Sequence, residues 1–398
     1  MRRLRTERVD GMRQQGTGVT VRPARLLIVD PQLAGQLAEL DSALLETAAD
    51  SLDVVRRAAA RLRRMAGEGT RTREPCTVVY RLASGGHQQT GVVVDVSIDD
   101  YRNGHIRRHE ATRPERERRL GELLDAAQVE LVPVTLTHRA RPRLRSLLAE
   151  VAAGEPDVRV MSDDGHAQTI WIEHDPGLAQ AIQAELAGVD ALYIADGHHR
   201  MAVAERHAAR RHQGEGDSTA DFVLGALFPC DEMRLLGYHR ALTLPDGMPA
   251  SGLLAALADQ PGAERIEELT GAEAARAAPG VVVVWLDGRW YRLRLRAPRD
   301  PVNVRSSLDV VALDERVLAP LLRVADFGSH GRVTTLPGTS DAHAVARWCA
   351  AHRAAGFVLH PPSVEHVMAL ADAGLVMPPK STWFDPKARA GPFLRALG

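Results

Sequence analysis

This 398-residue sequence contains few cysteines and few lysines, and its positive and negative charges nearly balance. Its three cysteines, Cys76, Cys230 and Cys349, are far apart and form no CxxC pair, so neither a disulfide framework nor a zinc cage is indicated. A reducing cytoplasm is the expected location. The formal net charge of −1 provides no overall field for nucleic acid or anionic lipid, so no nucleic-acid partner is expected.

A long apolar run is also missing. GVVVVWL at residues 280–286 has the length of a strand, whereas a membrane helix needs roughly 20 apolar residues. No membrane association is therefore expected. Residues 1–20 lack the apolar core of a signal peptide and are predicted to form a disordered basic tail.

Among the 50 Lys and Arg residues, only Lys380 and Lys387 are lysine, and both lie in PPKSTWFDPK. Coding bias accounts for the heavy use of arginine. A site that contacts one phosphate or carboxylate oxygen can nevertheless distinguish a compact ammonium from a planar guanidinium. The segment is therefore a candidate site, with chance clustering in a solvated loop as the alternative. The same scarcity excludes a P-loop lysine, and no GxxxxGK[ST] motif is present.

Length and pattern predict two lobes, because 398 residues exceed the usual size of one compact domain. Residues 33–66 have helical apolar spacing, and strands alternate with helices through the middle of the chain. Glycines predict hairpins in CTVVYRLASGGHQQTGVVVDVSI and in VVVVWLDGRWYRLRLR. The Pro- and Gly-rich segment PDGMPASG predicts a lobe boundary near residues 244–252. We expect an α+β fold with a tail at 1–20, a helical segment at 21–74, a mixed α/β core at 75–245 and a C-terminal α/β lobe at 246–398 with a loop-rich end.

The segment ALYIADGHHRMAVAERHAARR, residues 191–211, crowds Asp196, Gly197, His198, His199 and Arg200 together. A strand is predicted to end before Gly197, which allows a sharp turn, and the helix that follows has free N–H groups that attract anions. Asp196 could ligate Mg²⁺ brought by a nucleotide. Arg200 suits bidentate phosphate contacts, and the histidines could donate to the same oxygens or assist proton transfer. Helix capping by Asp196, buried hydrogen bonding by the histidines and a zinc site are the alternatives.

Four segments, taken in order, resemble domain-of-unknown-function family 1015. They span roughly residues 75–391 and read IDDYRNGHIRRHEATRPERERR, YIADGHHR, LDVVALDERVLAPLL and HPPSVEHVMALADAGLVMPPKSTWFDPKARAG. DGHHR also resembles the corresponding segment of free L-serine kinases. The resemblance implies a ParB/sulfiredoxin-like core at 75–245 that binds nucleotide, with the lobe at 246–398 closing over the substrate. The family's early Pro-Pro-Tyr-Asp-like segment has no counterpart in LLIVDPQLAGQLAELD.

The resemblance further implies a kinase that transfers a phosphoryl group from ATP or ADP, with Mg²⁺, to the hydroxyl of free L-serine or a serine-like metabolite. The product is O-phosphoserine or an analogue. Glu110 matches the general base of the serine kinases, although the arginines of HEATRPERERR could simply pair with it. The implied catalytic residues are Glu110, Asp196 and His198. Those implied for nucleotide and phosphate binding are Gly197, His199, Arg200 and His109, with Asp196 as the metal ligand. Those implied for substrate binding are His239, Arg240, Lys380, Ser381 and Thr382.

Alternatives from other classes stay open. Ser381 and Thr382 could serve only in turn hydrogen bonding. A nucleotide-gated ParB-like binding protein would not need Glu110, and an effector-binding regulator would be stabilised by serine without turnover. The chain is expected to be a monomer or a homodimer.

Overall fold

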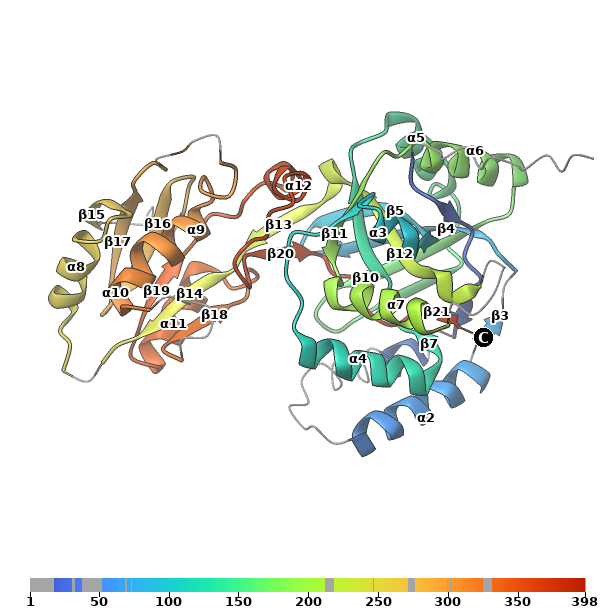
Figure 1. The fold of residues 1–398 in the computed structure, drawn as a ribbon, viewed down its shortest axis with the longest axis horizontal. Coiled ribbons are helices and arrows are strands. Elements are labelled where there is room, and N and C mark those ends of the chain that lie inside the picture. The colour runs from blue at the N-terminus through green and yellow to red at the C-terminus, as the bar shows by residue number, and fades with distance from the viewer. Residues whose placement is uncertain are drawn as a thin grey trace, which may run out of the picture.

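The fold is that of a computed structural model, which describes residues 18–30, 33–37, 52–68, 70–72, 74–211, 218–245, 247–270, 276–298, 300, 303–324 and 331–397. Of the tail predicted at 1–20, residues 1–17 lie outside the described residues. The fold is mixed α+β, as predicted (Figure 1). In the described part of the chain, no helix is both long and apolar enough to cross a membrane.

The first lobe is built on a nine-stranded sheet. Its order is β6 (Ile106–Arg107), β11 (Leu192–Asp196), β8 (Val134–His138), β12 (Phe222–Pro229), β5 (His87–Ser97), β4 (Thr77–Ser84), β10 (Ala167–Glu173) and β9 (Val158–Met161), with β1 (Val21–Arg22) also paired to β5. Only β6–β11 and β8–β12 are parallel pairs among these described strands.

The β4–β5 hairpin confirms the first hairpin prediction. Its two turn residues, Gly85 and Gly86, have φ values of 55° and 77°, the left-handed region in which glycine carries no Cβ penalty. Beyond the turn, the β-branched run Val92–Val94 favours an extended chain buried on both faces.

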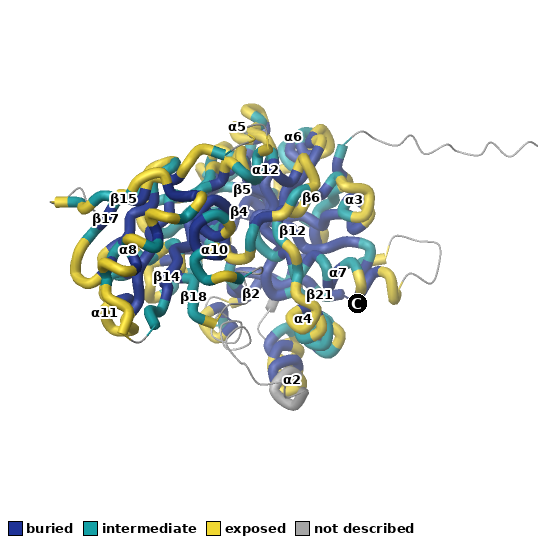
Figure 2. Tube along the Cα trace, turned by 60° about the vertical axis from the view of Figure 1, so that its left-hand side comes forward, coloured by how far each residue is buried: buried dark blue, intermediate teal, exposed yellow. Residues whose placement is uncertain are grey.

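Helices cover the sheet, and side chains alternate between its two faces along each strand. Val79 packs in the cluster that contains Leu144 and Ile182, whereas its neighbour Tyr80 packs in the cluster that contains Leu62. Figure 2 shows the central strands buried and the outer faces of the helices exposed. The helices of this lobe are α2 (Leu52–Glu68), α3 (Ile98–Arg102), α4 (Pro114–Ala127), α5 (Pro142–Val151), α6 (Pro176–Ala187) and α7 (His198–Arg211).

The second lobe contains a six-stranded sheet whose neighbours are all antiparallel. Its order is β15 (Ala263–Leu269), β17 (Arg289–Leu295), β16 (Val281–Leu286), β19 (Ala354–Val358), β14 (His239–Thr243) and β18 (Val333–Leu336). The β16–β17 pair confirms the second hairpin prediction. The accompanying helices are α8 (Ala250–Ala258), α9 (Asp309–Leu313), α10 (Ala319–Leu322) and α11 (Ala342–Ala351), with a π-helical turn at Asp314–Leu318 between α9 and α10.

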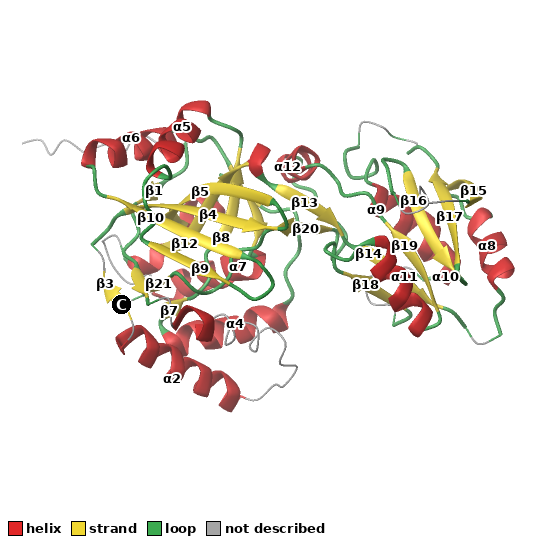
Figure 3. Ribbon diagram, turned by 180° about the vertical axis from the view of Figure 1, so that it is seen from behind, coloured by secondary structure: helices red, strands yellow, loops and turns green. Residues whose placement is uncertain are grey.

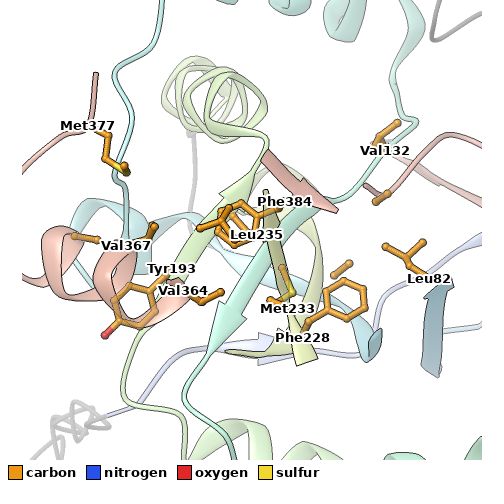
Figure 4. Close-up of a cluster of buried hydrophobic side chains, with 14 of the residues drawn as sticks. Leu82, Val132, Tyr193, Phe228, Met233, Leu235, Val364, Val367, Met377 and Phe384 are labelled. Carbon is orange, nitrogen blue, oxygen red and sulfur yellow. The ribbon is translucent and has the colours of Figure 1, made fainter. Parts of the chain in front are cut away.

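A two-stranded ribbon joins the lobes, as Figure 3 shows from behind. It pairs β13 (Arg234–Gly237) with β20 (Thr382–Asp385), and α12 (Val364–Asp372) lies beside it. Leu235 and Phe384 are partners in the ribbon and sit in the same buried cluster as Val364 and Val367 of α12 (Figure 4). The apolar core therefore continues from one lobe to the other.

The chain ends in the first lobe. There β21 (Phe393–Ala396) lies between β2 (Leu27–Val29) and β7 (Val129–Glu130), and β3 (Thr70–Thr72) completes this small sheet. Arg395 is buried with its guanidinium 2.7 Å from Asp95 and 2.5 Å from Glu130. The end of the chain, predicted to be loop-rich, thus contains β20 and β21. Strands of four residues show no clear alternation, and their partners lie far away in the sequence.

Candidate active site

The site begins at the turn between β11 and α7. β11 ends at Asp196, Gly197 has a φ of 98°, and α7 starts at His198, as the sequence predicted. A Cβ on Gly197 would lie 2.9 Å from Nε and Nη2 of Arg200. Glycine therefore suits the left-handed turn, and any larger residue here would also push the Arg200 guanidinium from its position.

Two cationic side chains hold the Asp196 carboxylate. Arg200 Nη2 donates to Oδ2 at 2.8 Å, and Lys387 Nζ forms an ion pair with Oδ1. Burial opposes ionisation of Asp196, but Lys387 and Arg200 outweigh it and hold its pKa well below the usual range. Asp196 is therefore an anion at neutral pH, with both oxygens already engaged.

Glu110 faces this turn from the segment between β6 and α4. Its Oε2 lies 3.9 Å from Nδ1 of His198, and its side chain is about one-third exposed, at 34%. Burial raises the pKa of Glu110, and the nearby ammonium groups of Lys380 and Lys387 oppose that shift only in part. A carboxylate with a raised pKa is a stronger proton acceptor than an ordinary glutamate.

The histidines of the site are neutral at neutral pH. Burial lowers the pKa of His109 to about 4, that of His199 to about 4, and that of His198 well below its usual value. His109 and His198 pack edge to face with ring centroids 4.6 Å apart, and His109 Nε2 lies 3.2 Å from the Thr382 hydroxyl. His199 Nε2 accepts from the Arg113 amide at 3.0 Å. The positive charge of the site thus comes from arginine and lysine.

Most of these groups, but not His109, line a cavity of about 210 Å³. It combines charged side chains with an apolar wall contributed mainly by α4, α7 and the strands β7 and β8. The wall consists of Leu120, Leu123, Leu124, Val129, Leu131, Val132, Val134, Val203, Ala204 and Val223. The polar lining includes Glu110, Arg116, Asp196, His198, His199, Arg200, Tyr238, Lys380, Thr382 and Lys387.

A second cavity of about 860 Å³ lies between the lobes. Glu110 and Arg113 line it from the first lobe, and Arg240, Asp314 and other residues line it from the second. Glu110 and Lys380 line both cavities. A carboxylate with a raised pKa, that of Glu110, therefore lies where the two cavities adjoin.

Comparison by sequence identifies the family. Residues 36–311 match the family described as protein of unknown function DUF1015. The chain belongs to this family. The matched range includes Glu110 and the DGHHR turn and ends before Asp314, Lys380 and Lys387 of this DUF1015 chain. No curated protein matches the sequence.

Several solved structures are similar to this DUF1015 chain at low identity. A free serine kinase variant in complex with ADP is 14% identical, covers 75% of this chain and 92% of its own, and has a TM-score of 0.38. A conserved hypothetical protein from Pyrococcus furiosus is 14% identical, with 75% and 93% covered and a TM-score of 0.37. C-terminally truncated SbnI from Staphylococcus aureus is 12% identical, with 75% and 85% covered and a TM-score of 0.40.

Four of the predicted substrate-binding residues differ in their access to the cavities. Lys380 and Thr382 line the smaller one. Ser381 is buried, and its hydroxyl donates to the Pro378 carbonyl at 2.7 Å. His239 lies in β14, where Nε2 is 3.1 Å from the Ser340 carbonyl and Nδ1 accepts from the Leu359 amide. The DUF1015 chain thus uses His239 and Ser381 to hold backbone rather than to line the smaller cavity.

Arg240 likewise forms its polar contacts within the protein. Its side chain is 1% exposed, and its guanidinium binds Asp314 through two hydrogen bonds of 3.1 and 2.8 Å and donates to the Lys380 carbonyl at 2.8 Å. Lys380 itself has a φ of 55°. Arg240 therefore positions the Lys380 segment, in an ion pair whose Asp314 comes from the π-helical turn.

The residues do not form a resident metal site. Within the described ranges, no group of three His, Cys, Asp or Glu side chains is placed to hold a metal ion. The predicted ligand, Asp196, has both oxygens engaged by Arg200 and Lys387. Its carboxylate is the partner of two protein cations.

Of the polar residues that line the cavity, Arg116, Glu130 and Tyr238 were not predicted, and Lys387 was predicted only as part of its candidate segment. The rarity of lysine in the sequence draws attention to Lys387, but its partner Asp196 lies 191 residues away in the sequence. Arg116 resembles the other arginines of a charged helix. Tyr238 adjoins His239, and its ring lies 5.4 Å from Lys380 Nζ. Burial raises the pKa of Tyr238 to about 12, so its hydroxyl stays protonated at neutral pH.

Proposed function

We propose that this DUF1015 chain is a small-molecule kinase that transfers a phosphoryl group from ATP or ADP to the hydroxyl of free L-serine or a serine-like metabolite. The observation that carries the proposal is the position of Glu110. This carboxylate, with its raised pKa, lines both the cationic, apolar-walled cavity and the larger cavity between the lobes.

Two features of the smaller cavity support nucleotide binding. Its leucine and valine wall suits the faces of a planar base, while Arg200 and Lys387 lie at the turn that opens α7. A helix N-terminus and fixed cationic side chains stabilise the charge that spreads over phosphoryl oxygens in the transition state. We assign the first lobe to the ParB/sulfiredoxin-like class on the resemblance of its motifs, and we regard magnesium as a companion of the nucleotide phosphates.

The larger cavity holds the acceptor. The acceptor oxygen forms the new bond to phosphorus as Glu110 takes the hydroxyl proton, and the bond from phosphorus to the bridging oxygen breaks so that the nucleotide leaves with that electron pair. The neutral His198 beside Glu110 lets the carboxylate keep its basicity, because it adds no positive charge there. The second lobe, which begins at β14, closes over the acceptor, and Lys380 and Thr382 contact it.

Purified protein tests the proposal directly. L-serine and ATP or ADP in magnesium-containing buffer should yield O-phosphoserine, detected by mass spectrometry. Glu110→Gln should reduce turnover by at least 100-fold, the usual size of a general-base effect, with nucleotide affinity changed less than about threefold. Nucleotide binding without transfer to any small hydroxy amino acid would instead assign the chain to nucleotide-gated binding proteins. Equal turnover by Glu110→Gln would refute the role of Glu110.

A further inference from the structure

The two lysines of this arginine-rich chain meet in one cavity. The sequence contains 50 lysine and arginine residues, of which only Lys380 and Lys387 are lysine, and both line the cavity of the DGHHR turn. Its other two cationic lining residues, Arg116 and Arg200, are arginine. A general preference for arginine would have placed arginine at 380 and 387 too, unless the site needs the compact ammonium.

Lys387 is held by its backbone while its ammonium reaches the turn. The Lys387 carbonyl lies 2.8 Å from Nε2 of His166. Its Nζ is paired with Asp196 and lies 5.2 Å from the centre of the Trp383 ring. The side chain is 32% exposed, so a ligand in the cavity can reach the ammonium without displacing the segment that carries it.

We propose that Lys387 is the phosphate-binding ammonium of this cavity, held on Asp196 until a phosphate group replaces that carboxylate as its partner. The proposal rests on the nucleotide use proposed above. It assigns to Lys387 the task that a P-loop lysine performs elsewhere, in a chain that has no P-loop.

The charges around Asp196 allow this exchange of partners. When Lys387 turns to a phosphate oxygen, Arg200 still neutralises Asp196 through Oδ2. No carboxylate is left buried and unpaired, which would otherwise be costly. An ammonium can change partner by moving its three freely rotating donors, whereas a guanidinium offers a fixed planar fork. Arg200 is therefore the permanent partner of Asp196, and Lys387 is the exchangeable one.

Binding measurements on variants test the role of Lys387. Lys387→Met, which keeps the side-chain length but removes the charge, should weaken ADP binding at least tenfold and adenosine binding less than twofold in calorimetric titrations. Lys387→Arg should still weaken ADP binding at least threefold. The matched control is Arg389→Met, because Arg389 lies on the same segment and pairs with Asp164 away from the cavity. It should change neither affinity more than twofold.

The results separate this assignment from the proposed function. If the wild-type protein binds neither ADP nor inorganic pyrophosphate, both fail. If the wild type binds ADP but Lys387→Met binds it equally well, or loses ADP and adenosine affinity to the same extent, only the role of Lys387 fails. Wild-type affinity in Lys387→Arg would refute the need for an ammonium.

Chemical labelling gives a second readout on the unmodified chain. Trace acetylation of the wild-type protein, followed by peptide mass spectrometry, measures the reactivity of each lysine separately. Saturating ADP should slow acetylation of Lys387 at least fivefold, and adenosine should not. The same rate with and without ADP would overturn the assignment.

Discussion

The guanidinium of Arg240 joins the Asp314 carboxylate and the Lys380 carbonyl inside the second lobe. Through it, an internal ion pair fixes the backbone of a residue that lines the candidate active site. Arg240, which the family resemblance implies at the substrate, thus lines the larger cavity and also positions the Lys380 segment.

Arg240→Met should destabilise the protein by about 3–5 kcal/mol, because Asp314 would remain buried without its partner. The double variant Arg240→Met/Asp314→Leu should recover most of that loss in urea unfolding. Both variants should raise the KM for the acceptor, since neither holds Lys380. A single variant as stable as the wild type would contradict the buried-pair description.

The acid limb of the activity profile should lie above the ordinary glutamate pKa. The base must be ionised to accept a proton, so kcat/KM should rise with pH through the raised pKa of Glu110. Lys380→Met should move this limb to higher pH, because the ammonium of Lys380 favours the carboxylate. A limb that stays in place in Lys380→Met would show that another group controls it.

Gly197→Ala should impair both stability and nucleotide binding. The new methyl would combine a φ of 98° with contacts of 2.9 Å to Arg200, at a cost of about 1–3 kcal/mol for the strained backbone alone. Gly165→Ala is the matched control, because Gly165 has a φ of 77° with nothing within 4 Å of the new methyl. Thermal melts should fall in both variants, and ADP affinity only in Gly197→Ala. Equal affinities in the two would refute the link to Arg200.

Folding stability should fall as the pH drops from about 6.5 towards 4. His109 has a folded pKa of about 4 against an ordinary 6.5, so in this window the unfolded chain takes up a proton that the folded protein excludes. At the acid end of this window, the neutral His109 lowers the free energy of unfolding by up to about 3 kcal/mol relative to pH 7. Urea unfolding of His109→Gln should show a shallower dependence on pH across this window. An unchanged slope would indicate that His109 is protonated in the folded state.

Local features of this fold could be predicted, and long-range ones could not. Gly85 and Gly86 determine their hairpin by backbone conformation alone, and Gly197 marks the strand-to-helix turn for the same reason. Strand pairings and ion pairs between residues far apart in the sequence cannot be predicted from the local sequence pattern. The strands that contain Thr382 and Phe393 are short and show no alternation, and the ion pair of Lys387 with Asp196 depends on how the end of the chain returns to the first lobe.

That return has a consequence for synthesis. Arg395 closes the buried charges of Asp95 and Glu130, and β21 completes the small sheet of the first lobe. A ribosome that has made residues 1–370 has therefore produced neither lysine of the cavity nor the strand that finishes this core. We therefore expect a product terminated at residue 370 to be less stable than the full chain and to lack both lysines of the cavity.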